Sequence, residues 1–176
     1  VGGATGAGGD APKYQLILAS DGLYYPDGSL PDEQAREHFL VKFPRRSSRQ
    51  GNSLESDRLI LETEHAYYQV AGRLGFDAIS SALHIESGRL QSKTASLWMP
   101  RFDRVLGHGG MERYAVESLY SIAGVIEPGA TVAHSTYLKQ LAHLWNEYDQ
   151  TDEVEGMVQE YLRRDLLNVV LGNSDN

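Results

Sequence analysis

The chain has 176 residues, of which 41% are hydrophobic and 23% are charged, values that are ordinary for a globular protein. Its formal net charge of −8 argues against broad non-specific binding to nucleic acid, because such binding needs a basic surface. The absence of cysteine excludes a disulfide framework and a Cys-based zinc site. No apolar run approaches the roughly 20 residues of a membrane span and no signal peptide opens the chain, so we expect a cytoplasmic protein without membrane contact.

The first half of the chain predicts strands with one helix among them. Residues 1–13 contain five glycines and a Pro-Lys pair, and they are expected to form a loop or a tight turn. Residues 47–57 are polar and predict a loop, whereas residues 59–74 are mostly good helix formers that end at Gly75. Four short apolar runs predict strands, at residues 14–20, 38–43, 81–86 and 94–99.

Beyond Pro100 the pattern becomes helical. Apolar residues recur at helical spacing in two segments, from Leu138 to Tyr148 and from Val154 to Val169. The sequence therefore predicts an α+β protein with a strand-rich front half and a helical back half. Because the chain opens without methionine and stops at Asn176, soon after a hydrophobic segment, we expect a fragment of a longer protein.

The glycine run is the first of three candidates for chemistry. Backbone N–H groups in a Gly-rich turn can approach phosphate oxygens, because no side chain blocks them. The run is not a Walker A loop, since Lys13 is followed by Tyr14 rather than by Ser or Thr, and no strand precedes it as in a Rossmann fingerprint. On its own the run is more typical of a flexible linker than of a phosphate loop.

Lys42 is the second candidate, because it interrupts the apolar strand between Val41 and Phe43. On its own it is more typical of an edge-strand lysine that discourages aggregation. A nucleotide-binding lysine needs a carboxylate to hold it, and Glu62 and Glu64 lie on the following helix-like stretch. A strand lysine followed by a helix glutamate is the arrangement with which kinases hold the α- and β-phosphates. We therefore expect an ion pair between Lys42 and one of these two glutamates.

Asp175 is the third candidate, within the terminal run from Gly172 to Asn176. A glycine and a polar loop after a helix are ordinary punctuation, and such an aspartate alone is typical of a turn. Kinase catalytic loops, however, place an aspartate where it orients the attacking hydroxyl and accepts its proton. The six histidines show no HExxH motif, and we expect no metal site made of them.

Taken in order, these features resemble the HipA family of serine/threonine protein kinases. The residues 8–13 are similar to its Gly-Gly-x-x-Pro-Lys phosphate loop, and residues 39–44, Phe-Leu-Val-Lys-Phe-Pro, to its ATP-lysine strand. Four further segments match in order: Glu64-His65-Ala66-Tyr67, Arg101-Phe102-Asp103-Arg104, Val116-Glu117-Ser118-Leu119, and residues 168–175 before the catalytic aspartate. The Gly-Asp-Ala-Pro-Lys-Tyr form of the loop is most similar to the YjjJ branch.

The resemblance implies a two-lobed protein-kinase-like fold, with an N-lobe over residues 1–99 and the hinge and first part of a helical C-lobe over residues 100–176. It implies transfer of the γ-phosphoryl group of ATP, with Mg²⁺, to a protein hydroxyl by a toxin of a toxin–antitoxin module. The implied ATP-binding residues are Gly8, Gly9, Lys13, Lys42, Glu64, Met99, Pro100, Arg101 and Phe102, and the catalytic base is Asp175. The resemblance makes Glu64 the partner glutamate, so we expect its ion pair with Lys42. The implied partners are a protein substrate of the aminoacyl-tRNA synthetase class and an antitoxin.

Some features depart from the family pattern. The serine that is autophosphorylated in better-known members corresponds to Gly6, with Thr5 beside it. The metal-binding asparagine and aspartate of the family lie beyond Asn176, so we expect residues 1–176 alone to lack a complete Mg²⁺ site, to show no turnover and to expose an apolar face on the helical part. We expect Asp103 and Arg104 to be structural. A kinase-fold phosphotransferase for small molecules and a non-catalytic nucleotide-binding or regulatory module are the alternative functions.

Overall fold

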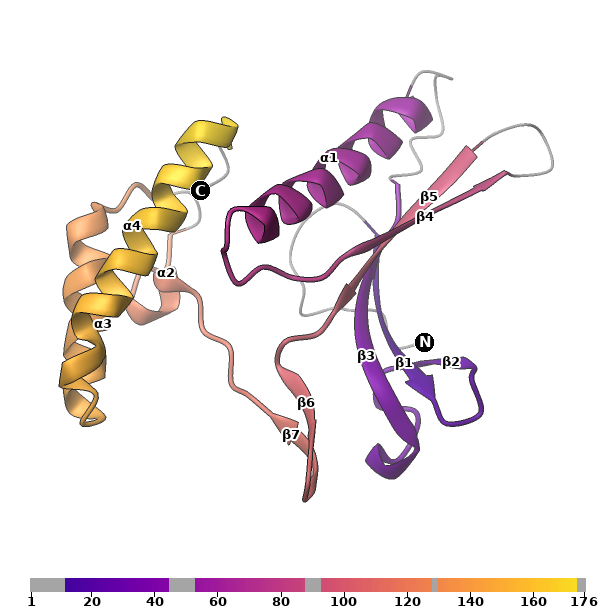
Figure 1. Cartoon of the computed structure of the whole chain (residues 1–176), viewed down its shortest axis with the longest axis horizontal. Coiled ribbons are helices and arrows are strands. Elements are labelled where there is room, and N and C mark those ends of the chain that lie inside the picture. The colour runs from indigo at the N-terminus through magenta and orange to yellow at the C-terminus, as the bar shows by residue number, and fades with distance from the viewer. Residues whose placement is uncertain (1–11, 45–52, 88–92, 128–129, 174–176) are drawn as a thin grey trace. The chain divides into compact units, whose positions relative to one another are not determined.

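The computed structural model describes residues 12–44, 53–87, 93–127 and 130–173, and Figure 1 shows their elements. The chain forms two compact units, Val1–Tyr114 and Ala115–Asn176. The first unit holds a five-stranded antiparallel sheet and a long helix, and the second is helical. This confirms the α+β class and is compatible with a kinase-like fold. The division into lobes at residues 99 and 100 stays a prediction.

The sheet has the strand order β2-β1-β3-β5-β4. Its strands are β1 (Lys13–Ala19), β2 (Tyr24–Pro26), β3 (Ala35–Lys42), β4 (Ala82–Ser87) and β5 (Lys93–Pro100). A 3-10 turn, η1 (Asp32–Gln34), leads into β3, and all paired strands are antiparallel. The strands predicted at residues 14–20, 38–43, 81–86 and 94–99 therefore correspond to β1, β3, β4 and β5.

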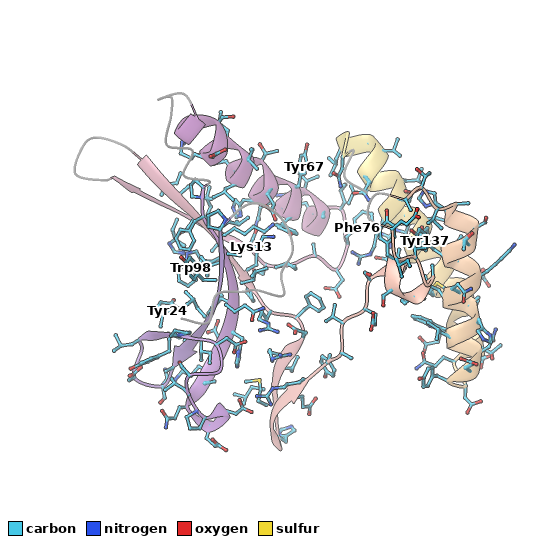
Figure 2. All side chains as sticks on the ribbon, turned by 180° about the vertical axis from the view of Figure 1, so that it is seen from behind. Lys13, Tyr24, Tyr67, Phe76, Trp98 and Tyr137 are labelled. Carbon is cyan, nitrogen blue, oxygen red and sulfur yellow. The ribbon has the colours of Figure 1, made fainter. Side chains whose placement is uncertain are left out.

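Helix α1 (Ser53–Arg73) packs along β5 and β4 on one face of the sheet (Figure 1). The core of this unit is built by Leu61 of the helix and by Ala95, Leu97 and Met99, which alternate along β5 and so share a face. Burial of this apolar cluster is the main force that fixes the helix on the sheet. The face turned away from α1 carries aromatic side chains, among them Tyr24 and Trp98, whose ring centroids lie 4.8 Å apart (Figure 2).

Two of our expectations for the first unit were wrong. Residues 53–57, expected within a loop, form the start of α1, because serine and acidic residues are favoured in the first turn of a helix despite their polarity. Residues after Pro100 are not helical at once, because β6 (Arg104–Gly107) and β7 (Gly110–Arg113) form a hairpin. Strands of four residues leave too short a pattern to be recognised by alternation.

The second unit contains α2 (Leu119–Ile122), α3 (His134–Glu147), the 3-10 turn η2 (Thr151–Glu153) and α4 (Val154–Leu171). Helix α4 ends at Gly172, which has a φ of 66° and closes the helix in the left-handed conformation that glycine adopts most easily. The expected apolar exposed face is present on α4, where Leu162, Leu166 and Val169 follow helical spacing and are exposed. None of the helices in the described ranges combines the length and apolar composition that crossing a bilayer requires.

Candidate functional site

The ion pair expected between Lys42 and Glu64 is present. The Lys42 Nζ donates a hydrogen bond to the Glu64 Oε1 at 2.5 Å, and the two side chains are 22% and 25% exposed. Lys42 lies directly opposite Leu97 in the ladder of β3 and β5, so its side chain projects on the same face as Leu97, the face on which α1 packs. Glu64 lies one turn after Leu61, the residue that anchors α1 on the sheet.

The structure shows which of the two glutamates, Glu62 or Glu64, is the partner of Lys42. Glu62 forms an ion pair with Arg58, four residues earlier on the same helix. Glu64 and Leu61 are three residues apart, so both lie on the sheet-facing side of α1. Glu62 is two residues before Glu64 and therefore lies on another side of the helix. The geometry therefore makes Glu64 the partner of the strand lysine.

Tyr68 is a third member of this cluster, and sequence reasoning missed it. Its hydroxyl donates to the same Glu64 Oε1, at 3.2 Å. Burial raises the pKa of the Tyr68 phenol to about 12, and the Glu64 carboxylate contributes to the rise. The signal in the sequence was its position four residues after Glu64, which places both on one side of the helix.

Lys13 adds a second ammonium group on the same face of the sheet. It is the first residue of β1 (Figure 2) and lies directly opposite Lys42 in the ladder of β1 and β3. The Phe43 N–H donates to the Pro12 carbonyl at 3.0 Å and continues this pairing to the edge of the described chain. This register brings the ammonium group of Lys13 to the side of the sheet on which Lys42 meets Glu64. Gly8 and Gly9 lie outside the described residues.

In the segment Met99–Phe102, the hydrogen-bonding groups of interest belong to the backbone rather than to the side chains. Met99 is buried in the core, and the Arg101 N–H donates to the His38 carbonyl at 2.8 Å. The described peptide bonds are trans, so the Pro100 carbonyl points the opposite way, away from β3. Because β4 starts opposite Trp98, this carbonyl lies beyond the ladder of β4 and faces the open edge of β5. A carbonyl in this position is able to accept a hydrogen bond.

The Arg101 side chain is fully engaged in a charge network. Its Nε and Nη2 donate to the two carboxylate oxygens of Asp103 at 2.9 and 2.6 Å, and its Nη1 donates to Asp27 at 2.7 Å. The Arg104 Nη1 donates to Asp103 as well, at 2.8 Å. Hydrogen bonds from Arg101 hold the pKa of the Asp103 carboxyl below its ordinary value, and they raise the pKa of Arg101 itself. These contacts agree with our expectation that Asp103 and Arg104 are structural residues.

Asp27 and His38 were missed by sequence reasoning. The Asp27 carboxylate lies 3.2 Å from Nδ1 of the buried His38 and also receives the bond from Arg101, which is 74 residues away. No spacing rule connects positions so far apart, so no local signal was available. The network ties the end of β5 to the turn after β2, and it thereby fixes the segment that carries the Pro100 carbonyl.

A pocket of about 360 Å³ lies beside this network rather than beside Lys42. Two arginines line it, but Arg104 is bound to Asp103 and Arg113 to Asp32 at 2.7 Å. Both guanidinium groups of the pocket are paired with carboxylates, as Lys42 is with Glu64, so charge pairing alone does not distinguish the two places.

Metal ligands are not gathered in the part of the chain that the structure describes, where no group of three or more His, Asp or Glu side chains could hold an ion. Asp175 lies outside the described residues, so its placement is not part of the observed site. The charged cluster that the structure describes on this face of the sheet is thus made of Lys42, Glu64 and Tyr68, with Lys13 opposite Lys42.

An antiparallel sheet with a helix packed on it and a lysine–glutamate pair between the two is compatible with a kinase-like protein. The chain belongs to the HipA-like C-terminal domain family, whose model matches residues 5–176. Membership of this family gives the context of kinase toxins. No curated protein and no solved structure shows a significant match to the chain.

Proposed function

We propose that the protein is a HipA-like serine/threonine protein kinase that transfers the γ-phosphoryl group of ATP to a protein hydroxyl. The single observation that carries the proposal is the ion pair between Lys42 and Glu64 on the sheet face that also presents Lys13. This arrangement fixes an ammonium group where it can meet phosphate oxygens, and phosphoryl transfer depends mainly on such positioning and charge stabilisation.

Each candidate site residue has a defined part in the proposed reaction. Lys42, held by Glu64, contacts the α- and β-phosphates, and Lys13 with the amides of Gly8 and Gly9 surrounds the phosphate chain. The adenine lies at the edge of β5, where the backbone of Met99–Phe102 contacts it and the Pro100 carbonyl accepts a hydrogen bond from its amine. Here Arg101 contributes only backbone, because its side chain is bound to Asp27 and Asp103.

Asp175 is the proposed general base, on the strength of its position in the sequence. It accepts the proton of the substrate hydroxyl as the oxygen of that hydroxyl bonds to the γ-phosphorus. The bond from the γ-phosphorus to the bridging oxygen breaks, and ADP leaves with the electron pair. Mg²⁺ accompanies ATP in such reactions, but no described residue set fits it and we assign it no residues here.

The finer parts of the proposal follow the family. They are membership of the YjjJ branch, a cytoplasmic toxin whose target is of the aminoacyl-tRNA synthetase class, and control by an antitoxin. The family match to residues 5–176 supports the toxin context. None of these parts is needed for the phosphoryl transfer itself.

The test is incubation of the full-length protein with γ-labelled ATP and a cell lysate, followed by separation of proteins and small molecules. A labelled protein band is expected, and Lys42→Met should reduce its formation by roughly 100- to 1,000-fold, the loss typical of a charge-stabilising group. Asp175→Asn should abolish transfer while ATP binding stays nearly unchanged. Lys139→Met, at an exposed position of α3, is the control and should have no effect. Label in a small molecule, or no label at all, would overturn the proposal.

A further inference from the structure

The Glu64 carboxylate receives two donors on the same oxygen, one from the sheet and one from its own helix. Lys42 of β3 donates to Oε1 at 2.5 Å, and the Tyr68 hydroxyl donates to it at 3.2 Å. We propose that Tyr68 is a positioning residue, whose hydroxyl holds the Glu64 carboxylate in the place where Lys42 meets it. The use of this cluster in phosphoryl transfer rests on the proposed function, whereas the positioning itself does not.

The two contacts differ in what they depend on. Glu64 and Tyr68 are one helical turn apart, so their contact requires only that α1 is formed. The contact with Lys42 requires in addition that the helix lies correctly on the sheet, because Lys42 comes from a strand 22 residues earlier. Tyr68 therefore limits the direction of the Glu64 side chain through a contact that does not involve the lysine.

Positioning matters here because the ion pair joins two long and flexible side chains. Both are about a quarter exposed, and bringing them together costs conformational entropy on each side. A glutamate has three rotatable bonds and few of its rotamers place Oε1 beside Lys42. A second donor removes part of that freedom, so that less is lost when the ammonium group is bound.

The ring of Tyr68 gives its hydroxyl a fixed origin. It packs against the core cluster of Leu61, Ala95, Leu97 and Met99, so the ring cannot follow a moving carboxylate. A phenol is protonated at neutral pH and can donate, and burial together with the neighbouring carboxylate raises the pKa of Tyr68 further, to about 12. A rigid ring with a protonated hydroxyl is suited to hold a flexible side chain in one rotamer.

The first experiment needs no nucleotide. Lysine amines of the full-length protein are labelled competitively with an acylating reagent, and the rate at Lys42 is compared with the rate at Lys139 by mass spectrometry. Tyr68→Phe keeps the ring and removes the hydroxyl, and it should make Lys42 react roughly three- to tenfold faster, as loss of one hydrogen bond of typical net strength implies. Tyr114→Phe removes a similar bond, to Glu112 on an exposed hairpin, and should leave Lys42 unchanged.

The second measurement repeats Tyr68→Phe in a Glu64→Gln background. If Tyr68 acts through the Glu64 carboxylate, the rate at Lys42 should rise no further when the second substitution is added. A residue that only packs in the core would change the rate by the same factor in both backgrounds. That additive result, or an unchanged rate for Tyr68→Phe alone in a folded protein, would overturn the proposal.

Phosphoryl transfer is then measured in the same variants. With the proposed function correct, Tyr68→Phe should lower kcat by about tenfold with a smaller change in the KM for ATP, because the lysine position matters more for transfer than for binding. Absence of transfer in the unaltered protein would contradict the proposed kinase, while the labelling rates would still decide the role of Tyr68.

Discussion

Replacing Arg101 with alanine should lower the free energy of unfolding of the first unit substantially. The side chain makes three hydrogen bonds to carboxylates, and Arg101, Asp103 and Asp27 are only 12%, 14% and 23% exposed. Breaking a largely buried pair leaves a charge without compensation and costs about 3–5 kcal/mol. Arg104 stays with Asp103 and His38 stays with Asp27, so we expect the lower end, about 3 kcal/mol.

Urea unfolding measures this loss. Trp98 lies in the first unit and Trp145 in the second, so a Trp145→Phe background leaves Trp98 fluorescence as the reporter of the sheet. With a slope of about 2 kcal/mol per molar urea, the midpoint should fall by about 1.5 M. Arg113→Ala is the matched control, because its pair with Asp32 is 52% and 35% exposed and is expected to contribute less than about 1 kcal/mol. Equal shifts for Arg101→Ala and Arg113→Ala would refute the argument from burial.

The remaining predictions concern Arg104 and the pH. Arg104→Ala should lower the melting temperature, while the phosphoryl-transfer rate of the folded protein stays within about twofold because Arg101 still holds Asp103. An unchanged melting temperature with loss of all transfer would show that the role of Arg104 is chemical. The folded pKa of Tyr68, about 12, lies above the ordinary value of 10, so folding favours the protonated phenol. That contribution is complete below pH 10 and is lost as the pH rises toward 12. Unfolding free energies at pH 9 and pH 11 should therefore differ less in Tyr68→Phe than in the unaltered protein, and an equal difference in both would contradict the shifted pKa.

The strands and the ion pair were within reach of the sequence because each depends on a local pattern. Short apolar runs with alternating burial lead to β1, β3, β4 and β5, apart from their ends. Lys42 could be recognised because a charged residue within an apolar strand needs a counter-charge, and the next helix offers two carboxylates. The choice of Glu64 over Glu62 followed from the family motif, and the structure agrees since Glu62 is bound to Arg58.

The rest depends on contacts that no local pattern encodes. Asp27 meets Arg101 and His38 only after β1, β3 and β5 have paired, and an aspartate before a glycine otherwise indicates no more than a turn. The hairpin of β6 and β7 is too short to give a period. Tyr68 had a recognisable position, but its hydroxyl gains a role only because Glu64 is held beside the sheet.

The end of the sheet where Lys13 faces Lys42 is hard to explain by stability alone. Directly opposite positions in an antiparallel ladder favour opposite charges or apolar pairs, and two lysines there are unfavourable. The same face carries Glu64 and Tyr68, which keep Lys42 in a fixed place rather than letting it extend into solvent. A local arrangement that breaks a stabilising rule, and that further residues hold in position, is expected where a ligand completes it. The ammonium group of Lys42, held by Glu64 and near a second lysine, suits the multiply charged phosphate chain of the ATP that we propose as ligand.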